Sequence, residues 1–265
     1  MNFQPVVPFG GYAGWQFLQR TLEAQKSRLS QDPALERATA GFEARFSTMT
    51  RAEDLVGDRQ VLQVALGAYG LDEDLPNRAF IRKVLEEGTA EQGALANRLA
   101  DSRYRALSED LGFGPFGLPG YLRTGFVDDL LTTYRDRQFE QSVGAQNEDM
   151  RLALNMAREL PLLGSKDQSA DGAWFSVMGQ PPLRAVFERA FGLPTGFGTL
   201  DLDQQLRVFR EKADALLGVS EVSELSDAKV QDQLLRRFFA NSTEIGGFSM
   251  SVRGAAALTL LQSAA

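Results

Sequence analysis

Adjacent acidic residues are the most numerous groups in this 265-residue sequence that could do chemistry. Two carboxyl groups that face one cleft, roughly 5 to 9.5 Å apart, can hydrolyse a glycosidic bond. Neighbouring side chains on a helix point about 100° apart, so adjacent acids usually lie in water. We therefore predict solvated surface for these residues, with a carboxylate-dependent hydrolase as the alternative. The acids are Asp72, Glu73 and Asp74, Glu86 and Glu87, Glu109 and Asp110, Asp128 and Asp129, and Asp201 and Asp203.

Three glycines, Gly112, Gly114 and Gly117, match the spacing G-x-G-x-x-G. This motif binds the pyrophosphate of a dinucleotide as a turn between a strand and a helix, where backbone amides meet the phosphates. Helical patterns flank the glycines on both sides here, and Pro115 removes one amide donor. The stretch 112–120 is therefore predicted to be a loop between two helical units, without a cofactor.

The sequence contains no cysteine and no histidine. This composition excludes thiolate catalysis, a Ser-His-Asp triad, an imidazole base, and metal sites with thiolate or imidazole ligands. Ser165 beside Lys166 lacks the spacing of a known Ser-Lys pair, and we predict a surface loop there. We expect no catalytic residue, no bound cofactor and no metal site.

The formal net charge of -7 indicates which partners the chain avoids. Nucleic acids and anionic membranes both favour proteins with clustered Lys and Arg, so we expect neither as a partner. No run of about 18 apolar residues occurs, so membrane insertion is not expected. The apolar fraction of 43% is typical of a globular protein.

One stretch of the sequence occurs twice, and it organises the helices that must position the candidate residues described above. Residues 57–71 and 179–193 align without a gap. The identical pairs are Gly57/Gly179, Val64/Val186, Ala68/Ala190, Gly70/Gly192 and Leu71/Leu193. The similarity continues outward, because KVLEE at 83–87 recurs as RVFRE at 207–211 after one small insertion. The pattern indicates a duplicated helical unit.

Each copy carries signals for the start and the end of a helix. Asp58 can cap the first helix, and Pro181 and Pro182 suit the first turn of the second. Gly70 and Gly192 are predicted to end the two helices in the left-handed conformation, with the leucine after each glycine folding back onto the last turn.

The first fourteen residues are rich in proline and glycine, with interspersed aromatic residues. They are typical of an extended arm that docks onto the body or onto another protein. A helix with one apolar face is predicted to begin at Trp15. Phe3, Phe9, Tyr12 and Trp15 are therefore a possible surface for a partner.

Helical periodicity dominates the chain, and no stretch alternates long enough to indicate a sheet. We therefore predict an all-α fold of two tandem divergent helical repeat units, packed as a multi-helix array. The expected divisions are an apolar Pro/Gly-rich arm at 1–14, a first unit at 15–118, a second unit at 119–240, and a C-terminal loop with a short helix at 241–265. Whether the two units form one domain or two stays open.

Several segments also occur in the order of a known family. They are DLVGDRQVLQVALGAYGL (54–71), RLADSRYRAL (98–107), TYRDRQFEQSVG (133–144) and FERAFGLP (187–194). From about residue 15 to 240 the chain resembles the bacterial family catalogued as domain of unknown function 1217, found in α-proteobacteria and commonly encoded among flagellar genes. The resemblance implies an association with flagellar assembly or motility, and it implies no catalytic residue.

These observations favour a non-enzymatic protein that binds other proteins, among them flagellar components, through its helical surfaces and its apolar arm. A second hypothesis is the carboxylate-dependent hydrolase. A third is an exported flagellar subunit whose termini become ordered on assembly. The expected compartment is the cytoplasm, with the flagellum as the alternative for a subunit exported without a cleaved signal.

Overall fold

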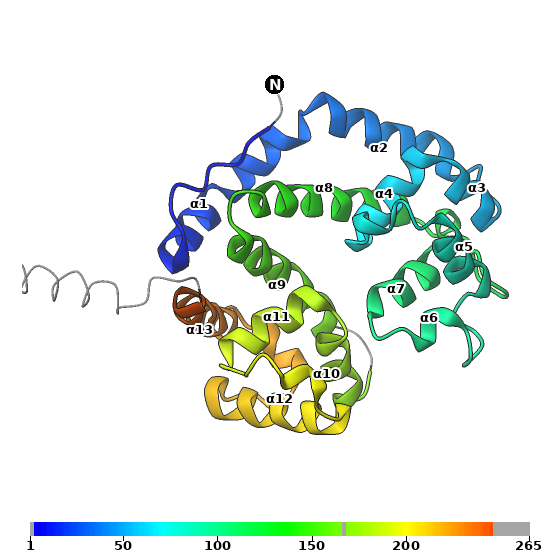
Figure 1. Ribbon diagram of the computed structural model, residues 1–265. Helices are drawn as coiled ribbons and strands as arrows, with labels where there is room; N and C mark the ends of the chain where they lie inside the picture. The colour runs from blue at the N-terminus through cyan, green and yellow to red at the C-terminus, as the bar shows by residue number, and fades with distance from the viewer. Residues whose placement is uncertain (1–2, 166–167, 246–265) are drawn as a thin grey trace, which may run out of the picture.

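The computed structural model describes residues 3–165 and 168–245, which form thirteen α-helices and contain no β-strand (Figure 1). The predicted all-α class is confirmed for these residues. The segment 246–265, where the sequence predicted a loop and a short helix, lies outside the described residues.

Seven helices make up the first half of the chain. They are α1 (Gly11–Ser30), α2 (Pro33–Phe46), α3 (Ala52–Gly57), α4 (Arg59–Tyr69), α5 (Arg78–Glu87), α6 (Leu95–Arg98) and α7 (Ser102–Leu111). A 3-10 turn, η2 (Gly120–Leu122), then leads into the second half.

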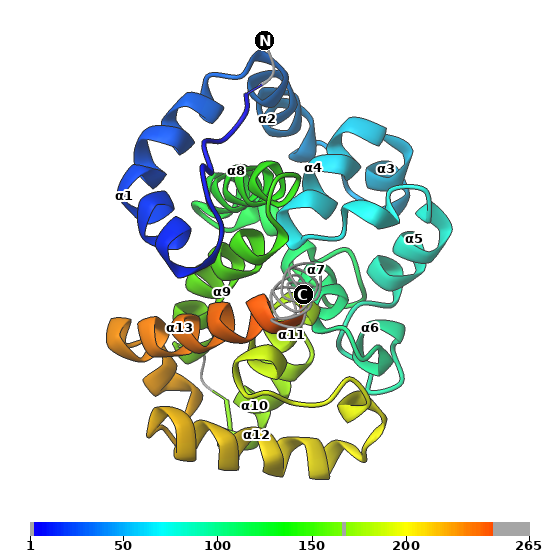
Figure 2. The same cartoon turned by 60° about the vertical axis from the view of Figure 1, so that its left-hand side comes forward.

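Six helices follow. They are α8 (Phe126–Gly144), α9 (Glu148–Gly164), α10 (Ala170–Met178), α11 (Pro181–Ala190), α12 (Leu202–Leu217) and α13 (Ala228–Ile245). Helices α8 and α9 pack on each other in the middle of the molecule (Figure 1). Helix α2 lies at one end and α12 at the other (Figure 2).

Helix ends follow the capping residues of the sequence. The Asp58 carboxylate accepts hydrogen bonds from the Gln60 and Val61 amides at 3.0 and 3.2 Å and so caps α4. Gly70 and Gly192 both have positive φ, +69° and +64°. The amide after each glycine donates to the carbonyl five residues earlier, at 2.9 Å in both cases, which closes the two helices in the same way.

Helix α1 begins at Gly11, four residues before the predicted start at Trp15. The additional turn is Gly-Tyr-Ala-Gly, whose intrinsic helix propensity is low. Tertiary contacts stabilise it instead, because the Tyr12 hydroxyl donates a hydrogen bond to Asp232 on α13. The arm is therefore shorter than the sequence predicted.

Helix α8 begins at Phe126, because the segment before it is folded as η2. The predicted division at residue 240 differs from the structure, because helix α13 continues to Ile245. The Asn241 side chain donates to the Arg189 carbonyl at 2.7 Å, which holds this part of α13 against α11.

One hydrophobic core runs through both halves. Helix α4 is buried on almost every side and packs against α2 and α8. Gly67 lets α8 approach closely, because a Cβ at this position would lie 2.6 Å from the Tyr134 ring. In the second half, α11 packs against α9 and α13. The core therefore joins the segments predicted as two units.

Candidate functional site

The glycine-rich loop between α7 and α8 packs backbone against backbone. Gly112 ends α7 with φ +66°. A Cβ at Gly112 would collide with the Leu118 carbonyl, and one at Gly114 would collide with the backbone of Gly88. A Cβ at Gly117 would lie 2.6 Å from the Gly112 oxygen. The three motif glycines therefore serve the internal packing of this loop, in the place where the sequence predicted a loop between units.

The tip of the loop is a tight turn from Gly114 to Gly117. The Gly117 amide donates to the Gly114 carbonyl at 3.0 Å. Pro115 is the second residue of the turn, and Phe116 is the third with φ +63°. A type II turn has this arrangement and normally places glycine or asparagine third. Phe116 is the only residue other than glycine with positive φ within the described part of the chain.

Phe116 is the most exposed of the large apolar residues in the described part of the chain. Its side chain is 95% exposed, and Leu118 and Leu122 are 58% and 60% exposed. We call these three residues the apolar tip. The neighbouring ring of Phe113 turns the other way and packs edge-on against Phe46 at 6.3 Å between centroids. The loop is thus anchored in the core on one side and presents an apolar surface on the other.

A small hollow of about 170 Å³ lies beside the apolar tip. Its walls come from Gly88, Thr89 and Ala90 after α5, from Glu109 on α7, and from the loop itself, including Phe116. The walls are low because several of these residues have little or no side chain. Glu109 supplies the single carboxylate.

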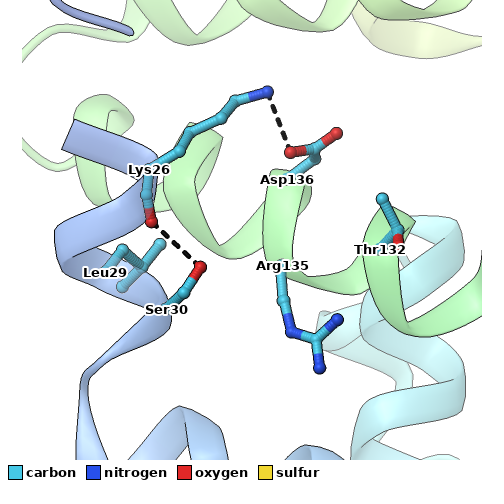
Figure 3. A pocket seen from close by; sticks show the side chains of 6 residues that line it. All are labelled: Lys26, Leu29, Ser30, Thr132, Arg135 and Asp136. Atoms are coloured by element: carbon cyan, nitrogen blue, oxygen red, sulfur yellow. Dashed lines mark hydrogen bonds and ion pairs between the residues drawn. The ribbon is translucent and has the colours of Figure 1, made fainter. Parts of the chain in front are cut away.

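A second hollow, of about 160 Å³, lies between α1 and α8 (Figure 3). The Lys26 ammonium pairs with the Asp136 carboxylate at 2.9 Å. The Arg135 guanidinium is directed away from that pair (Figure 3). Lys26 and Asp136 neutralise each other, so the hollow offers one cation and a few hydroxyl groups.

The predicted acidic surface residues are dispersed over the molecule. Tyr104 donates to Asp74 at 2.6 Å, and Tyr69 donates to Asp110 at 2.9 Å. Asp201 caps α12 by accepting from the Asp203 amide at 2.9 Å. Each of the two hollows contains one carboxylate, whereas glycoside hydrolysis uses two that face each other.

A buried ionic network joins α8 to α9. Glu159 accepts hydrogen bonds from Arg158 and from Arg137, the latter at 2.7 Å. Glu140 accepts from Arg158 at 2.7 and 3.1 Å. Burial lowers the pKa of Arg137 to about 10, and its Nε has no hydrogen-bond partner. Burial acts to lower the pKa of Arg158 as well, but the charges and hydrogen bonds of the two glutamates raise it above its usual value. The network fixes the angle between the two central helices.

All four aromatic residues predicted as a possible partner surface contact the body of the protein. Trp15 is 5% exposed and packs against Phe239 at 6.4 Å between ring centroids. The Phe3 ring lies 6.1 Å from that of Phe139, and Tyr12 is bonded to Asp232. Phe9 is half exposed, and its ring lies 6.0 Å from that of Phe17 on α1. The arm docks because unpaired backbone groups of residues 3–10 find polar partners, which composition alone does not reveal.

Gln25 holds the arm at its centre. Its side chain accepts from the Val6 amide at 2.7 Å and donates to the Val6 carbonyl at 3.2 Å. Gln146 donates to the Pro5 carbonyl at 2.8 Å. These bonds satisfy the backbone of an extended segment that has no strand beside it.

The residues of the internal repeat occupy comparable but not identical positions. Val64, Ala68, Val186 and Ala190 are all buried, as is Leu71, and Leu193 is partly buried against the same core. Gly57 is the last residue of α3, and a Cβ there would meet nothing within 4 Å. Gly179 is different, because a Cβ there would lie 3.2 Å from the Ala100 carbonyl.

Other sites considered from the sequence do not gain support from the described residues. Within residues 3–165 and 168–245, no three acidic side chains are grouped so that they could hold a metal ion. No helix in the same part of the chain has both the length and the apolar character needed to cross a bilayer. Ser165 lies at the end of α9, and Lys166 lies outside the described residues.

The apolar tip was not identified as a site from the sequence. The segment Gly-Pro-Phe-Gly at 114–117 carries a usable signal, because a turn with proline second favours glycine or asparagine third. A phenylalanine in the third position is unfavourable for the turn and therefore suggests another role.

Comparisons with known proteins identify a family and a similar structure. A family model described as protein of unknown function (DUF1217) matches residues 68–230. The chain is also similar to the crystal structure of a protein from Agrobacterium tumefaciens determined by a structural genomics consortium, with 26% sequence identity and a TM-score of 0.72. The similarity covers 90% of this chain and 96% of that one. No curated protein matches.

Proposed function

Because the chain belongs to a family of proteins of unknown function, DUF1217, its role must be inferred from its own residues, and we propose that it binds another protein through the apolar tip. In this proposal the chain is a non-enzymatic scaffold, and Phe116 is the anchor of the contact.

The conformation and exposure of Phe116 carry this proposal. Burying a phenylalanine side chain contributes roughly 1.5 to 3 kcal/mol of favourable free energy. This contribution is absent in the free protein, because the Phe116 side chain is exposed. Its left-handed backbone conformation costs a further 1 to 2 kcal/mol, approximately. Burial of the ring in a partner would gain the first contribution and so offset the backbone strain, which persists in the rigid loop, and large buried side chains carry most of the binding energy of protein interfaces.

The rigidity of the loop supports the same proposal. Gly112, Gly114 and Gly117 lock the loop against itself and against Gly88. The Arg123 guanidinium lies 4.5 Å above the Phe126 ring and donates to the Asp110 carbonyl, which fixes the end of the loop to α7. A preorganised anchor loses little conformational entropy on binding, which favours affinity.

The cellular context that we propose is flagellar assembly or motility in α-proteobacteria, in the cytoplasm. The resemblance of segments 54–71, 98–107, 133–144 and 187–194 to the flagellar-gene-associated family supports it. The partner is then a flagellar component.

The experiment replaces Phe116 by Ser on the chromosome of the source bacterium and measures swimming in soft agar. We expect a reduced swimming radius and loss of one protein from affinity-purified complexes. Leu162→Ser is the matched control, because Leu162 is also an exposed large apolar residue but lies on α9, outside the loop.

Two outcomes would contradict the proposal. If Phe116→Ser and Leu162→Ser retain the same bound proteins, the apolar tip is not the binding site. If deletion of the whole gene leaves swimming unchanged, the assignment to motility is wrong, and the binding proposal then depends on the purification result alone.

A further inference from the structure

We propose that the hollow beside Phe116 receives an arginine side chain of the partner protein. This inference rests on the proposed function and specifies what the partner presents to the apolar tip. The observations that support it are the size of the hollow, its single carboxylate and the free face of the Phe116 ring.

The size of the hollow favours one side chain as its occupant. Its volume of about 170 Å³ is well below the roughly 300 to 1,000 Å³ of small-molecule sites. The walls of Gly88, Ala90 and Pro115 are suited to the methylene groups of a long side chain.

The charges around the hollow favour a cation. Glu109 lines it, and its carboxylate forms no hydrogen bond or ion pair with the described part of the chain. Of two arginines near Glu109 in sequence, Arg123 is held by Asp110 and Phe126, and Arg105 is exposed one turn before Glu109 on α7. Asp128 and Asp129 are exposed in the first turn of α8, just after the loop. From residue 105 to residue 129, four acids (Glu109, Asp110, Asp128 and Asp129) occur with two arginines (Arg105 and Arg123), so this segment has a net negative charge.

The Phe116 ring distinguishes arginine from lysine. The ring makes no aromatic or cation contact with the described residues, so both of its faces are free. A guanidinium stacks on an aromatic face and can bind a carboxylate through two parallel hydrogen bonds. Phe116 and Glu109 line the same hollow, so one arginine can use both.

The acidic surroundings make other occupants less favourable. A second copy of this chain would bring the same three acids against themselves across a two-fold axis. An anionic membrane or a nucleic acid would be repelled by them. A basic segment of another protein is the occupant whose charge is complementary.

The test is an NMR titration of the full chain with N-acetyl-arginine methylamide. We expect shifts confined to the backbone amides of residues 88–90 and 109–117. N-acetyl-citrulline methylamide has the same shape without the charge, and we expect it to bind at least about fivefold more weakly, corresponding to about 1 kcal/mol for an exposed cation–π contact or ion pair. The lysine analogue should bind more weakly than the arginine probe.

Two variants identify the groups involved. Glu109→Gln keeps the shape and removes the charge, and Phe116→Leu keeps an apolar side chain and removes the aromatic face. Each should weaken the arginine probe about fivefold while the rest of the spectrum is unchanged. Asp171→Asn, an exposed acid on α10, should have no effect on the probe.

The inference is overturned if arginine and citrulline probes bind equally, if the lysine analogue binds as well as the arginine one, or if the shifts lie elsewhere. Loss of the partner in Phe116→Ser together with equal binding of the two probes removes the arginine assignment and leaves the proposed function standing. If the arginine probe binds specifically but the Phe116→Ser variant loses no partner, the arginine assignment stands and the proposed function is wrong.

Discussion

At the scale of single residues, Phe116 and the network around Arg137 are both energetically unfavourable features, but they have opposite explanations. Phe116 exposes an aromatic ring on a backbone that favours glycine, and nothing in the described chain compensates it. Arg137 is buried with an unpartnered Nε, but Glu159 on the next helix compensates its charge. The first pattern is typical of binding and the second of structure.

Replacing Phe116 by Gly should leave the free energy of unfolding unchanged or raise it by up to about 1 kcal/mol. The substitution removes left-handed strain of about 1 to 2 kcal/mol, and the greater freedom of glycine in the unfolded chain offsets part of that gain. Urea denaturation of the purified protein measures it. A loss of more than 1 kcal/mol would mean that Phe116 stabilises the fold and has no need of a partner.

Replacing Glu159 by Ala should cost about 3 to 5 kcal/mol, because Arg137 and Arg158 would remain buried without their shared carboxylate. The matched control is Glu148→Ala on the same helix. The Glu148 carboxylate is 55% exposed and pairs with Arg151, and its loss should cost about 1 kcal/mol or less. Equal losses in the two variants would show that the network adds nothing beyond an ordinary surface pair.

At the scale of helices, the sequence predicts those features that depend on neighbouring residues. The Asp58 cap and the glycine stops at Gly70 and Gly192 have local causes, and all are found. The early start of α1 and the docking of the arm depend on Asp232 and Gln25, which are distant in sequence. The segment 112–120 is predicted as a loop. The exposure of Phe116 depends both on the turn that it occupies and on which other side chains of the protein are buried.

The two glycine stops should respond differently to alanine. Gly192→Ala should cost about 1 to 2 kcal/mol through its positive φ alone, because its Cβ would meet nothing within 4 Å. Gly70→Ala should cost more, since its Cβ would lie 2.7 Å from Nη1 of Arg137 and disturb the ionic network.

The control for this pair is Gly57→Ala, at the end of α3 and without positive φ. It should be neutral or stabilise the protein by up to about 1 kcal/mol, since alanine is preferred to glycine in a helix. Equal effects of alanine at Gly57 and Gly192 would show that the left-handed stop does not contribute to stability.

At the scale of the whole molecule, the order of helices in the two halves is similar. The repeat helices α4 and α11 each follow a short helix, and each packs against the helix two positions earlier and the last helix of its half. The tandem duplication itself stays a prediction, which these parallels favour. A shared core, in contrast, could not be predicted, because it depends on α8 packing against both α4 and α9.

The two halves should therefore unfold together. Trp15 lies on α1 and Trp174 on α10, so Trp15→Phe and Trp174→Phe each leave one fluorescent reporter in a different half. We expect each variant to unfold in one transition. For each variant, the midpoint measured by fluorescence should coincide with the midpoint measured by circular dichroism, which reports the loss of helix. A difference between the two signals in either variant would indicate two independently folding domains.

The most direct measurement of binding through the apolar tip is site-specific photocrosslinking in the source bacterium. The photoreactive residue p-benzoylphenylalanine replaces Phe116 in one strain and Leu162 in another, since both positions are exposed. We predict a light-dependent adduct with a single protein from position 116 and none from position 162. Absence of an adduct at 116, or the same adducts at both positions, would contradict the claim that Phe116 anchors a partner.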